Sequence, residues 1–173
     1  MSEESSQSPL IAQIAGILEV DDWNYQVESE GSLIGEVNGN TGSWGCRINV
    51  LGEPGELQVR VISTIPVRVP ESRRPQMAEF LMRLNVDFTI GHFFLSFDEG
   101  AIGYYTNIEL MDGILTMEMF RRIFYANLQT VDADLASILS VAYGQVTPQD
   151  AYQALSENAV LDAEPVSTES TFQ

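Results

Sequence analysis

The chain of 173 residues has no lysine, one histidine and one cysteine. Its basic side chains are eight arginines, set against 25 acidic side chains, and the formal net charge is −17. Such a chain repels phosphate backbones and anionic membrane surfaces, so we expect neither nucleic acid nor a membrane as its partner. A polypeptide partner fits this charge, although the sequence does not identify it, and the acidic surface would steer basic segments.

The scarcity of cysteine and histidine also limits the chemistry that the chain can carry. The lone Cys46 has no partner for an internal disulfide, and together with the single His92 it cannot complete an ordinary structural zinc site. Without lysine there is no phosphate-binding Gly-Lys loop, and no nucleophile or orienting acid is evident beside His92. We therefore expect no enzymatic activity, no cofactor and no metal, and we expect Cys46 to be a buried structural thiol.

Long apolar runs are missing as well. The N-terminal stretch MSEESSQSP lacks the features of a secretory signal, and no segment approaches the roughly 18 consecutive apolar residues of a membrane span. Since a single cysteine forms no internal disulfide and needs no oxidising compartment, we expect a cytoplasmic protein. Residues 1–7 and 158–173 are polar and have little periodicity, so we expect a flexible N-terminus and a flexible acidic C-terminal tail around one domain, residues 8–157.

Hydrophobic periodicity predicts the elements of that domain. Period-two alternation predicts strands near residues 23–28, 44–50, 57–62, 92–97 and 101–108. Helical spacing predicts helices after Pro9, after Pro70, at 116–128, at 132–142 and after Thr147. The expected fold is therefore α+β, an antiparallel sheet of about five strands with helices packed on it in the order α-β-β-β-α-β-β-α, followed by extra C-terminal helices.

The run HFFLSFDEGAIGYYT predicts a β-hairpin with aromatic side chains on its outer face. Strand parity places His92 and Phe94 on one face, opposite an inward Phe93. A two-residue turn would pair Phe94 with Tyr105 and His92 with Asn107. Two interpretations stay open. The aromatic pair is covered or stabilises the sheet locally, or it is an interaction patch whose protein-binding residues are His92, Phe94 and Tyr105.

Arg47 and Arg60 form a second candidate site. A four-residue turn between their strands would place the two arginines opposite each other, which is unfavourable unless an acid or a ligand intervenes. Pairing with Glu28 or a neighbour is the ordinary explanation, and an anion-binding site is the alternative. We expect the Arg73-Arg74 and Arg121-Arg122 doublets to be solvated and paired with nearby acids, namely Glu71, Glu79 and Glu118.

Four segments carry a family resemblance: VPESRRPQMAEFLMRLN, GHFFLSFDEGAIGYYTNIEL, DGILTMEMFRRIF and GQVTPQDA. Together they resemble the YbjN family of bacterial sensory transduction regulators over about residues 43–152. The most specific pieces are Val69-Pro70-Glu71, Leu84-Asn85 and the hairpin after Gly91. The resemblance implies a fold like that of type III secretion chaperones, which commonly form homodimers that hold partner polypeptides, and it brings no catalytic residues with it.

Residues and resemblance together predict a non-enzymatic, chaperone-like or regulatory protein-binding module that acts as a homodimer. The alternative is a small-molecule or anion-binding sensory domain that uses Arg47 and Arg60. An enzyme with an unrecognised site is a third class, for which the sequence offers no motif.

Overall fold

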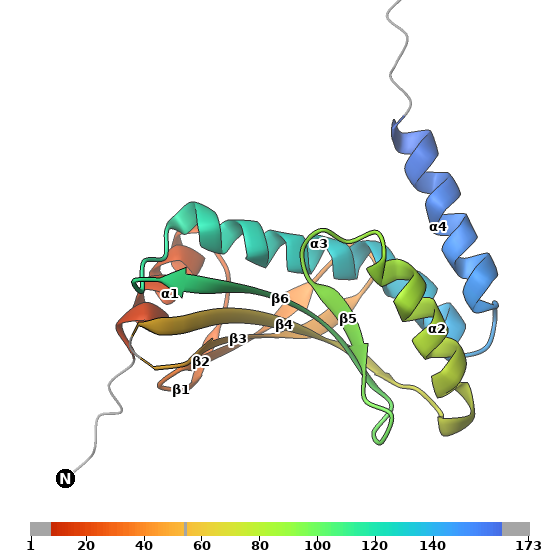
Figure 1. The fold of residues 1–173 in the computed structure, drawn as a ribbon, viewed down its shortest axis with the longest axis horizontal. Helices are drawn as coiled ribbons and strands as arrows, with labels where there is room; N and C mark the ends of the chain where they lie inside the picture. The colour runs from red at the N-terminus through yellow and green to blue at the C-terminus, as the bar shows by residue number, and fades with distance from the viewer. Residues whose placement is uncertain (1–7, 54, 164–173) are drawn as a thin grey trace, which may run out of the picture.

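Six antiparallel strands form one sheet with the order β1-β2-β3-β4-β6-β5 (Figure 1). The strands are β1 (Gln26–Ser29), β2 (Ser32–Asn38), β3 (Ser43–Leu51), β4 (Glu56–Arg68), β5 (His92–Leu95) and β6 (Ala101–Met111). The helices are α1 (Pro9–Val20), α2 (Arg74–Asn85), α3 (Met117–Ala142) and α4 (Pro148–Ala163), and a 3-10 turn η1 (Glu71–Arg73) precedes α2. This computed structural model describes residues 8–53 and 55–163. The predicted α+β class with an antiparallel sheet is confirmed.

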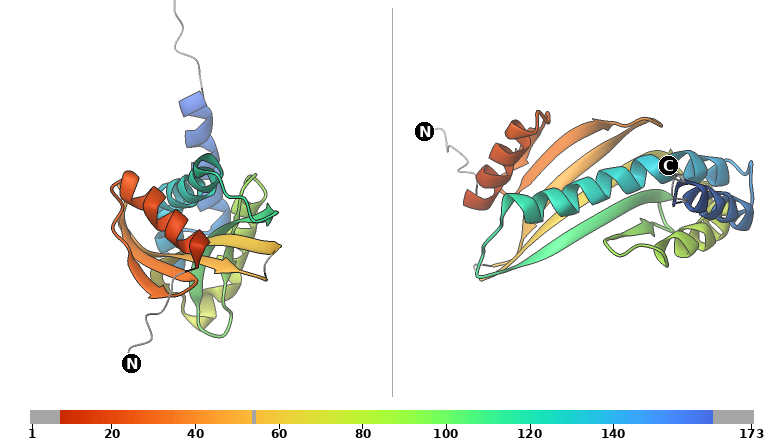
Figure 2. Two further views of the ribbon diagram at one scale, coloured as in Figure 1. Left: turned by 90° about the vertical axis from the view of Figure 1, so that its left-hand side faces the viewer. Right: turned by 90° about the horizontal axis from the view of Figure 1, so that it is seen from above.

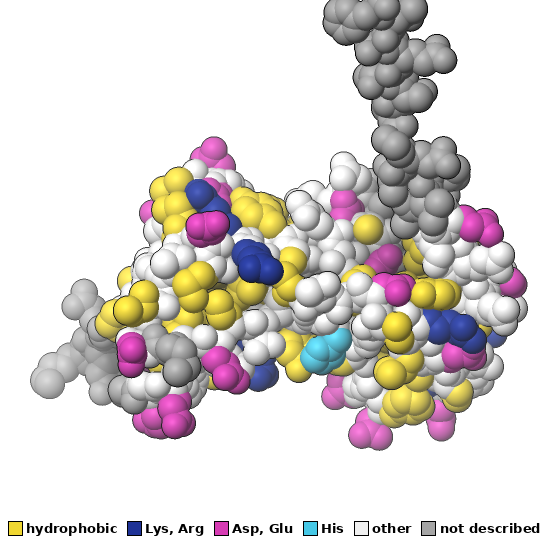
Figure 3. Space-filling view, turned by 45° about the horizontal axis from the view of Figure 1, so that its top comes forward, with side chains coloured by type: hydrophobic (Ala, Val, Ile, Leu, Met, Phe, Trp, Pro, Cys, Tyr) yellow, Lys and Arg dark blue, Asp and Glu magenta, His cyan; other side chains and the backbone are white. Residues whose placement is uncertain are grey.

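The helices lie on one side of the sheet. Seen from above, α3 runs along the length of the sheet, with α1 at one end and with α2 and α4 at the other (Figure 2). Along β3 the buried residues Trp44, Cys46 and Ile48 alternate with outward ones such as the exposed Arg47, so one face of the sheet is core and the other is open. The helical side mixes acidic and apolar side chains, and its few basic groups are separate (Figure 3).

Strand β2 is an addition to the predicted fold. The sequence predicts a connection here, because Gly35 and the Gly/Asn-rich stretch that follows it weaken the alternation. In the structure Leu33 and Val37 point into the core, and Gly35 lets the backbone of the preceding segment approach. A Cβ atom at Gly35 would lie 2.8 Å from the carbonyl oxygen of Asn24.

Helix α3 is continuous, so the prediction of two separate helices at 116–128 and 132–142 is wrong. It begins at the N-cap Thr116, whose hydroxyl accepts a hydrogen bond from the backbone N–H of Met119 at 3.1 Å, and it continues for 26 residues. Val131 and Leu135 are both buried, so packing maintains the helix through the weak helix formers Thr130 and Val131.

A buried polar network fixes α3 to the centre of the sheet. The side-chain amide of Asn127 donates hydrogen bonds to the carbonyl oxygens of Val61 at 3.1 Å and of Tyr104 at 3.2 Å. Its oxygen accepts one from the hydroxyl of Ser63 at 2.5 Å, and that hydroxyl accepts one from the indole N–H of Trp44 at 3.0 Å. Because these buried groups satisfy one another, the network fixes β3, β4 and β6 against one helix.

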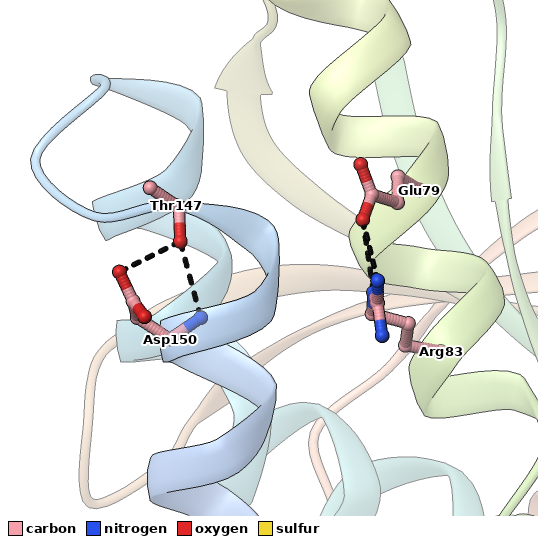
Figure 4. Close-up of polar contacts among 4 residues, drawn as sticks. All are labelled: Glu79, Arg83, Thr147 and Asp150. Atoms are coloured by element: carbon pink, nitrogen blue, oxygen red, sulfur yellow. Dashed lines mark hydrogen bonds and ion pairs between the residues drawn. The ribbon is translucent and has the colours of Figure 1, made fainter.

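Helix α4 rises away from the sheet at the end where α2 lies (Figure 1). The predicted N-cap Thr147 is confirmed, since its hydroxyl accepts a hydrogen bond from the N–H of Asp150 at 3.1 Å and donates one to the Asp150 carboxylate at 2.7 Å (Figure 4). The helix continues to Ala163, past the domain end expected at 157. Residues 1–7 and 164–173, for which we expect flexible ends, lie outside the described residues.

Candidate binding surface

The residues of both predicted sites lie on the same surface, the side of the sheet that none of the described helices covers. The register pairs Ile34 with Arg47, Arg47 with Ile62, Ile62 with Tyr105 and Tyr105 with His92, so these residues form a row across five strands. We define the open face by this row and its nearest outward neighbours: Ile34, Arg47, Arg60, Ile62, His92, Phe94 and Tyr105. The two sites that sequence reasoning treats separately are therefore parts of one face.

Tyr105 is at the centre of the aromatic part of the open face. The His92 ring packs edge-on against it, with 3.9 Å between ring centroids and an interplanar angle of 70°. The Phe94 ring lies 6.4 Å away, and the Arg60 guanidinium carbon lies 5.5 Å from the Tyr105 centroid. These contacts bring together the three predicted protein-binding residues and one of the two predicted anion-binding residues.

The predicted register of the hairpin is wrong by two residues. His92, and not Phe94, stands opposite Tyr105, and Phe94 stands opposite Gly103. The reason is the loop between β5 and β6, which spans residues 96–100 and is closed by hydrogen bonds from the N–H of Ser96 to the carbonyl of Ala101 and from the N–H of Gly100 to the carbonyl of Ser96, both 2.8 Å. A longer loop than the predicted two-residue turn moves every pair but leaves the side chains within the two strands on their predicted faces.

Gly103 lets the Phe94 ring approach the backbone of the strand beside it. A Cβ atom at Gly103 would approach the Phe94 Cζ atom to 2.5 Å and the Ser63 carbonyl oxygen to 2.8 Å. The ring therefore covers backbone that has no side chain of its own, and Phe94 still remains 38% exposed. Phe97, for which alternation predicts an inward side chain, lies instead in the loop and is 56% exposed.

The two arginines of the second site do not face each other, contrary to the prediction. Arg47 pairs with Ile62, and Arg60 lies between Asn49 and Asn107, because the last pair before the connection is Leu51 with Gln58 and not Leu51 with Glu56. The ordinary explanation for Arg47 is confirmed, since its Nη2 atom forms a 2.6 Å ion pair with Glu28.

Arg60 is held differently, without an ion pair to any described residue. Its Nη2 atom donates a hydrogen bond to the side-chain oxygen of Gln58 at 2.9 Å, and its guanidinium group lies over the Tyr105 ring. The Nε atom is buried and has no acceptor among the described residues. A buried N–H without an acceptor is costly, and among the described residues of the open face Arg60 carries the one buried side-chain atom that lacks a partner.

The arginine doublets are also not paired with the acids that the sequence predicts. Arg73 donates to the carbonyl of Val141 at 3.1 Å and Arg74 donates to the carbonyl of Phe97 at 2.5 Å, so both side chains extend from the start of α2 to backbone carbonyls. Arg121 pairs with Asp21, which lowers the pKa of that carboxyl. Of the three predicted acids, Glu79 binds Arg83 instead, at 2.7 Å along α2 (Figure 4).

Sequence reasoning missed Asn85, which closes the outer edge of β5. Its side-chain amide donates to the carbonyl oxygen of Phe93 at 3.0 Å, and its oxygen accepts from the N–H of Phe93 at 2.8 Å. The side chain thus takes the place of a neighbouring strand at an otherwise open edge. The only signal in the sequence is the position of Asn85 at the end of a helix that precedes a short strand.

Other potential sites on the chain do not converge on this face. Burial raises the pKa of the Cys46 thiol to about 12, so the predicted buried cysteine is confirmed. Within residues 8–53 and 55–163, no group of three or more His, Cys, Asp or Glu side chains could hold a metal ion. None of the helices in the same part of the chain combines the length and apolar character of a membrane span.

Fold and surface together define a small α+β domain with a helix-covered sheet and one open, aromatic face. The chain belongs to the YbjN family, whose model, described as "Putative bacterial sensory transduction regulator", matches residues 10–140. The resemblance indicated by the sequence motifs is therefore confirmed, and α4 lies beyond the matched residues. No curated protein matches the chain. Among solved structures, "Crystal Structure of the ExsC-ExsE Complex" is similar at 18% identity and a TM-score of 0.41, covering 73% of this chain and 89% of that chain.

Proposed function

We propose that the chain is a non-enzymatic, cytoplasmic regulatory module that binds a partner polypeptide through the open face and acts in a chaperone-like manner as a homodimer. Membership in a family of sensory transduction regulators supports a regulatory role. The observation that carries the proposal is the open face itself, where Phe94, Tyr105 and His92 form a contiguous aromatic cluster on the uncovered side of the sheet.

Physical chemistry supports a polypeptide contact at this face. The open side of an antiparallel sheet is ordinarily polar because water covers it. Here it carries aromatic rings, two aliphatic side chains and arginines, and aromatic residues and arginine are the types enriched where proteins bind one another. Tyr105 and Ile62 are half-buried by their neighbours, so a partner would meet side chains that are already ordered.

A small-anion sensor is the second candidate, and one observation favours it, the Nε atom of Arg60 that has no acceptor. Arg60 also borders a hollow of about 510 Å³ near the β3–β4 connection. However, Glu56 and Glu109 line the same hollow, and their charges oppose an anion there. Under this alternative, an anionic metabolite such as citrate would raise the melting temperature, and Arg47→Ala or Arg60→Ala would abolish the shift.

The test of the main proposal compares two aspartate substitutions close together in the sequence. Phe94→Asp places a charge in the aromatic cluster, whereas Phe97→Asp places one at an exposed ring outside the open face. Affinity purification from the native host with quantitative mass spectrometry should recover a specific partner with wild type and with Phe97→Asp, and should lose it with Phe94→Asp.

Circular dichroism and thermal melts establish that both variants are folded. Loss of the partner with both substitutions, or with neither, would contradict a contact at the open face. Recovery of the chain alone from every sample would argue against a protein-binding function altogether.

A further inference from the structure

We propose that the outer edge of β2, from Glu36 to Asn38, binds an extended basic segment of a partner polypeptide as an added strand of the sheet. Strands β3 and β4 separate this edge from the aromatic cluster on β5 and β6. The edge is therefore a contact surface additional to the one in the proposed function, and it would bind its segment whether or not the open face binds a partner.

The register shows which backbone groups of β2 are free. The N–H of Val50 donates to the carbonyl oxygen of Gly31 at 2.8 Å, and hydrogen-bonded pairs recur at every second residue of an antiparallel ladder. Glu36 and Asn38 therefore direct their backbone N–H and C=O groups away from β3. On that side β1 pairs no further along β2 than Ile34, and among the described residues no turn or loop residue bonds to these groups.

A bend in the chain before β1 leaves this edge uncovered. Gly35 has no side chain, and the carbonyl oxygen of Asn24 lies 2.8 Å from where a Cβ atom would be. The ring of the neighbouring Trp23 packs on the core side of the sheet. The chain thus passes beneath β2 instead of continuing β1 beside it. The space that remains is a hollow of about 660 Å³ between Tyr25 and the exposed Asn38.

The two terminal edges of the sheet are protected. β1 has four residues and its register shifts between Val27 and Ser29, and short or bulged edge strands resist further pairing. Asn85 bonds to the backbone of Phe93 and closes the outer edge of β5. The exposed end of β2 has no such protection among the described residues, so it is where the sheet accepts another strand.

The charges around the hollow favour a basic segment. Glu36 lines the hollow, is exposed and forms no ion pair with a described residue. Tyr25 lines it as well and donates a hydrogen bond to Glu19 at 2.7 Å, which adds a second carboxylate. Arg47, the diagonal neighbour of Glu36 on β3, is engaged by Glu28 at 2.6 Å. An added strand places one side chain directly beside Glu36, where an opposite charge attracts and a like charge repels.

The same charges disfavour this chain itself as the occupant. Residues 1–7 and 164–173 each contain two glutamates and neither lysine nor arginine. A second copy that paired edge to edge would bring Glu36 close to its counterpart. An extended segment that presents lysine or arginine beside Glu36 is the occupant that fits.

The experiment uses full-length protein and three fluorescently labelled peptides of about ten residues. They alternate valine and threonine, and the two central threonines are replaced by Lys, by Gln or by Glu. Anisotropy should show that the Lys peptide binds about tenfold more tightly than the Glu peptide, with the Gln peptide between them. Glu36→Lys should reverse this order. Glu56→Lys changes the net charge equally at an exposed residue of β4 and should preserve the order.

Backbone methylation tests whether the peptide adds as a strand. Two further Lys peptides carry N-methyl groups at every second residue, one on the lysine and threonine residues and the other on the valines. A strand at a single edge uses the N–H groups of alternate residues only. One methylated peptide should therefore bind like its parent, and the other should not bind.

Circular dichroism establishes that the Glu36→Lys and Glu56→Lys variants are folded. Equal affinity of the three peptides, no binding of any, or an order that Glu36→Lys leaves unchanged would overturn the inference. Loss of binding by both methylated peptides, or by neither, would exclude strand addition. A Lys peptide that dissociates a dimer in sedimentation velocity would assign the edge to a second copy and not to a partner.

The edge and the open face fail separately. If Phe94→Asp removed binding of the Lys peptide and Glu36→Lys did not, the peptide would lie on the open face, which would contradict the edge and support the proposed function. If the peptides bound as expected while no partner were captured from the native host, the edge would stand and the proposed function would not.

Discussion

At the scale of single residues, Asp134 is a carboxyl group placed among buried side chains. It lies on α3, is 7% exposed, and has no hydrogen-bond partner among the described residues. Burial raises the pKa of its carboxyl to about 6. Because this pKa is above the unfolded value, the native state holds the proton more tightly. The folded protein therefore loses stability as the pH rises through 6.

Asp134→Asn should accordingly stabilise the protein, and more so at high pH. The raised pKa corresponds to a gain of about 3 kcal/mol in unfolding free energy at pH 8 and about half of that at pH 5. Urea unfolding at the two pH values measures it. Asp132→Asn, two residues away, is the matched control. Hydrogen bonds from the N–H and hydroxyl of Thr41 lower the pKa of Asp132, so this substitution should decrease the unfolding free energy where Asp134→Asn increases it. An equal gain for Asp134→Asn at both pH values would contradict the assignment.

At the scale of elements, the end of α2 determines whether the edge of β5 is closed. Asn85→Ala removes two hydrogen bonds to the backbone of Phe93 and leaves a partly buried N–H and C=O without partners. We expect a loss of about 2 kcal/mol in unfolding free energy and faster hydrogen exchange at the Phe93 amide.

Asn107→Ala provides the control for this element. Asn107 lies on the adjoining strand, is exposed, and has no hydrogen-bond partner in the described part of the chain, so its removal should change stability by less than about 0.5 kcal/mol. Unchanged protection of the Phe93 amide in Asn85→Ala would show that another group closes the edge.

Alternation predicted correctly that His92, Phe94 and Tyr105 share a face, and that Trp44 and Cys46 share the opposite one. Both register errors, at the hairpin and at the β3–β4 turn, are slips of two residues. Because side chains repeat every two residues along a strand, such slips preserve the face and change only the neighbours.

The remaining errors have a common physical cause, which is long-range contact. Gly35 interrupts the pattern of β2, and only the approach of the segment around Asn24 explains the glycine. Side chains that bind distant backbone, such as Asn85 with Phe93 and Arg73 with Val141, leave no periodic signal in the sequence. The open face was therefore predictable by composition and parity, but the position of Arg60 beside Tyr105 was not.

At the scale of the whole molecule, the net charge of −17 bears on the proposed homodimer. Two such chains repel each other, and the repulsion extends over about 30 Å at 0.01 M ionic strength but only about 8 Å at 0.15 M. Contacts at an interface are short and are screened much less. Homodimer formation should therefore strengthen as salt is added from about 10 to 150 mM, the reverse of an association driven by opposite charges.

Sedimentation velocity across this range of salt, at a fixed protein concentration, provides the measurement. The double variant Phe94→Asp and Tyr105→Asp distinguishes partner binding from dimer formation. If the open face binds the partner and the dimer forms elsewhere, the double variant should sediment like the wild type while losing the partner. A dimer that dissociates in the double variant would place the interface on the open face, where it would compete with the partner segment. A monomer at every ionic strength would overturn the homodimer.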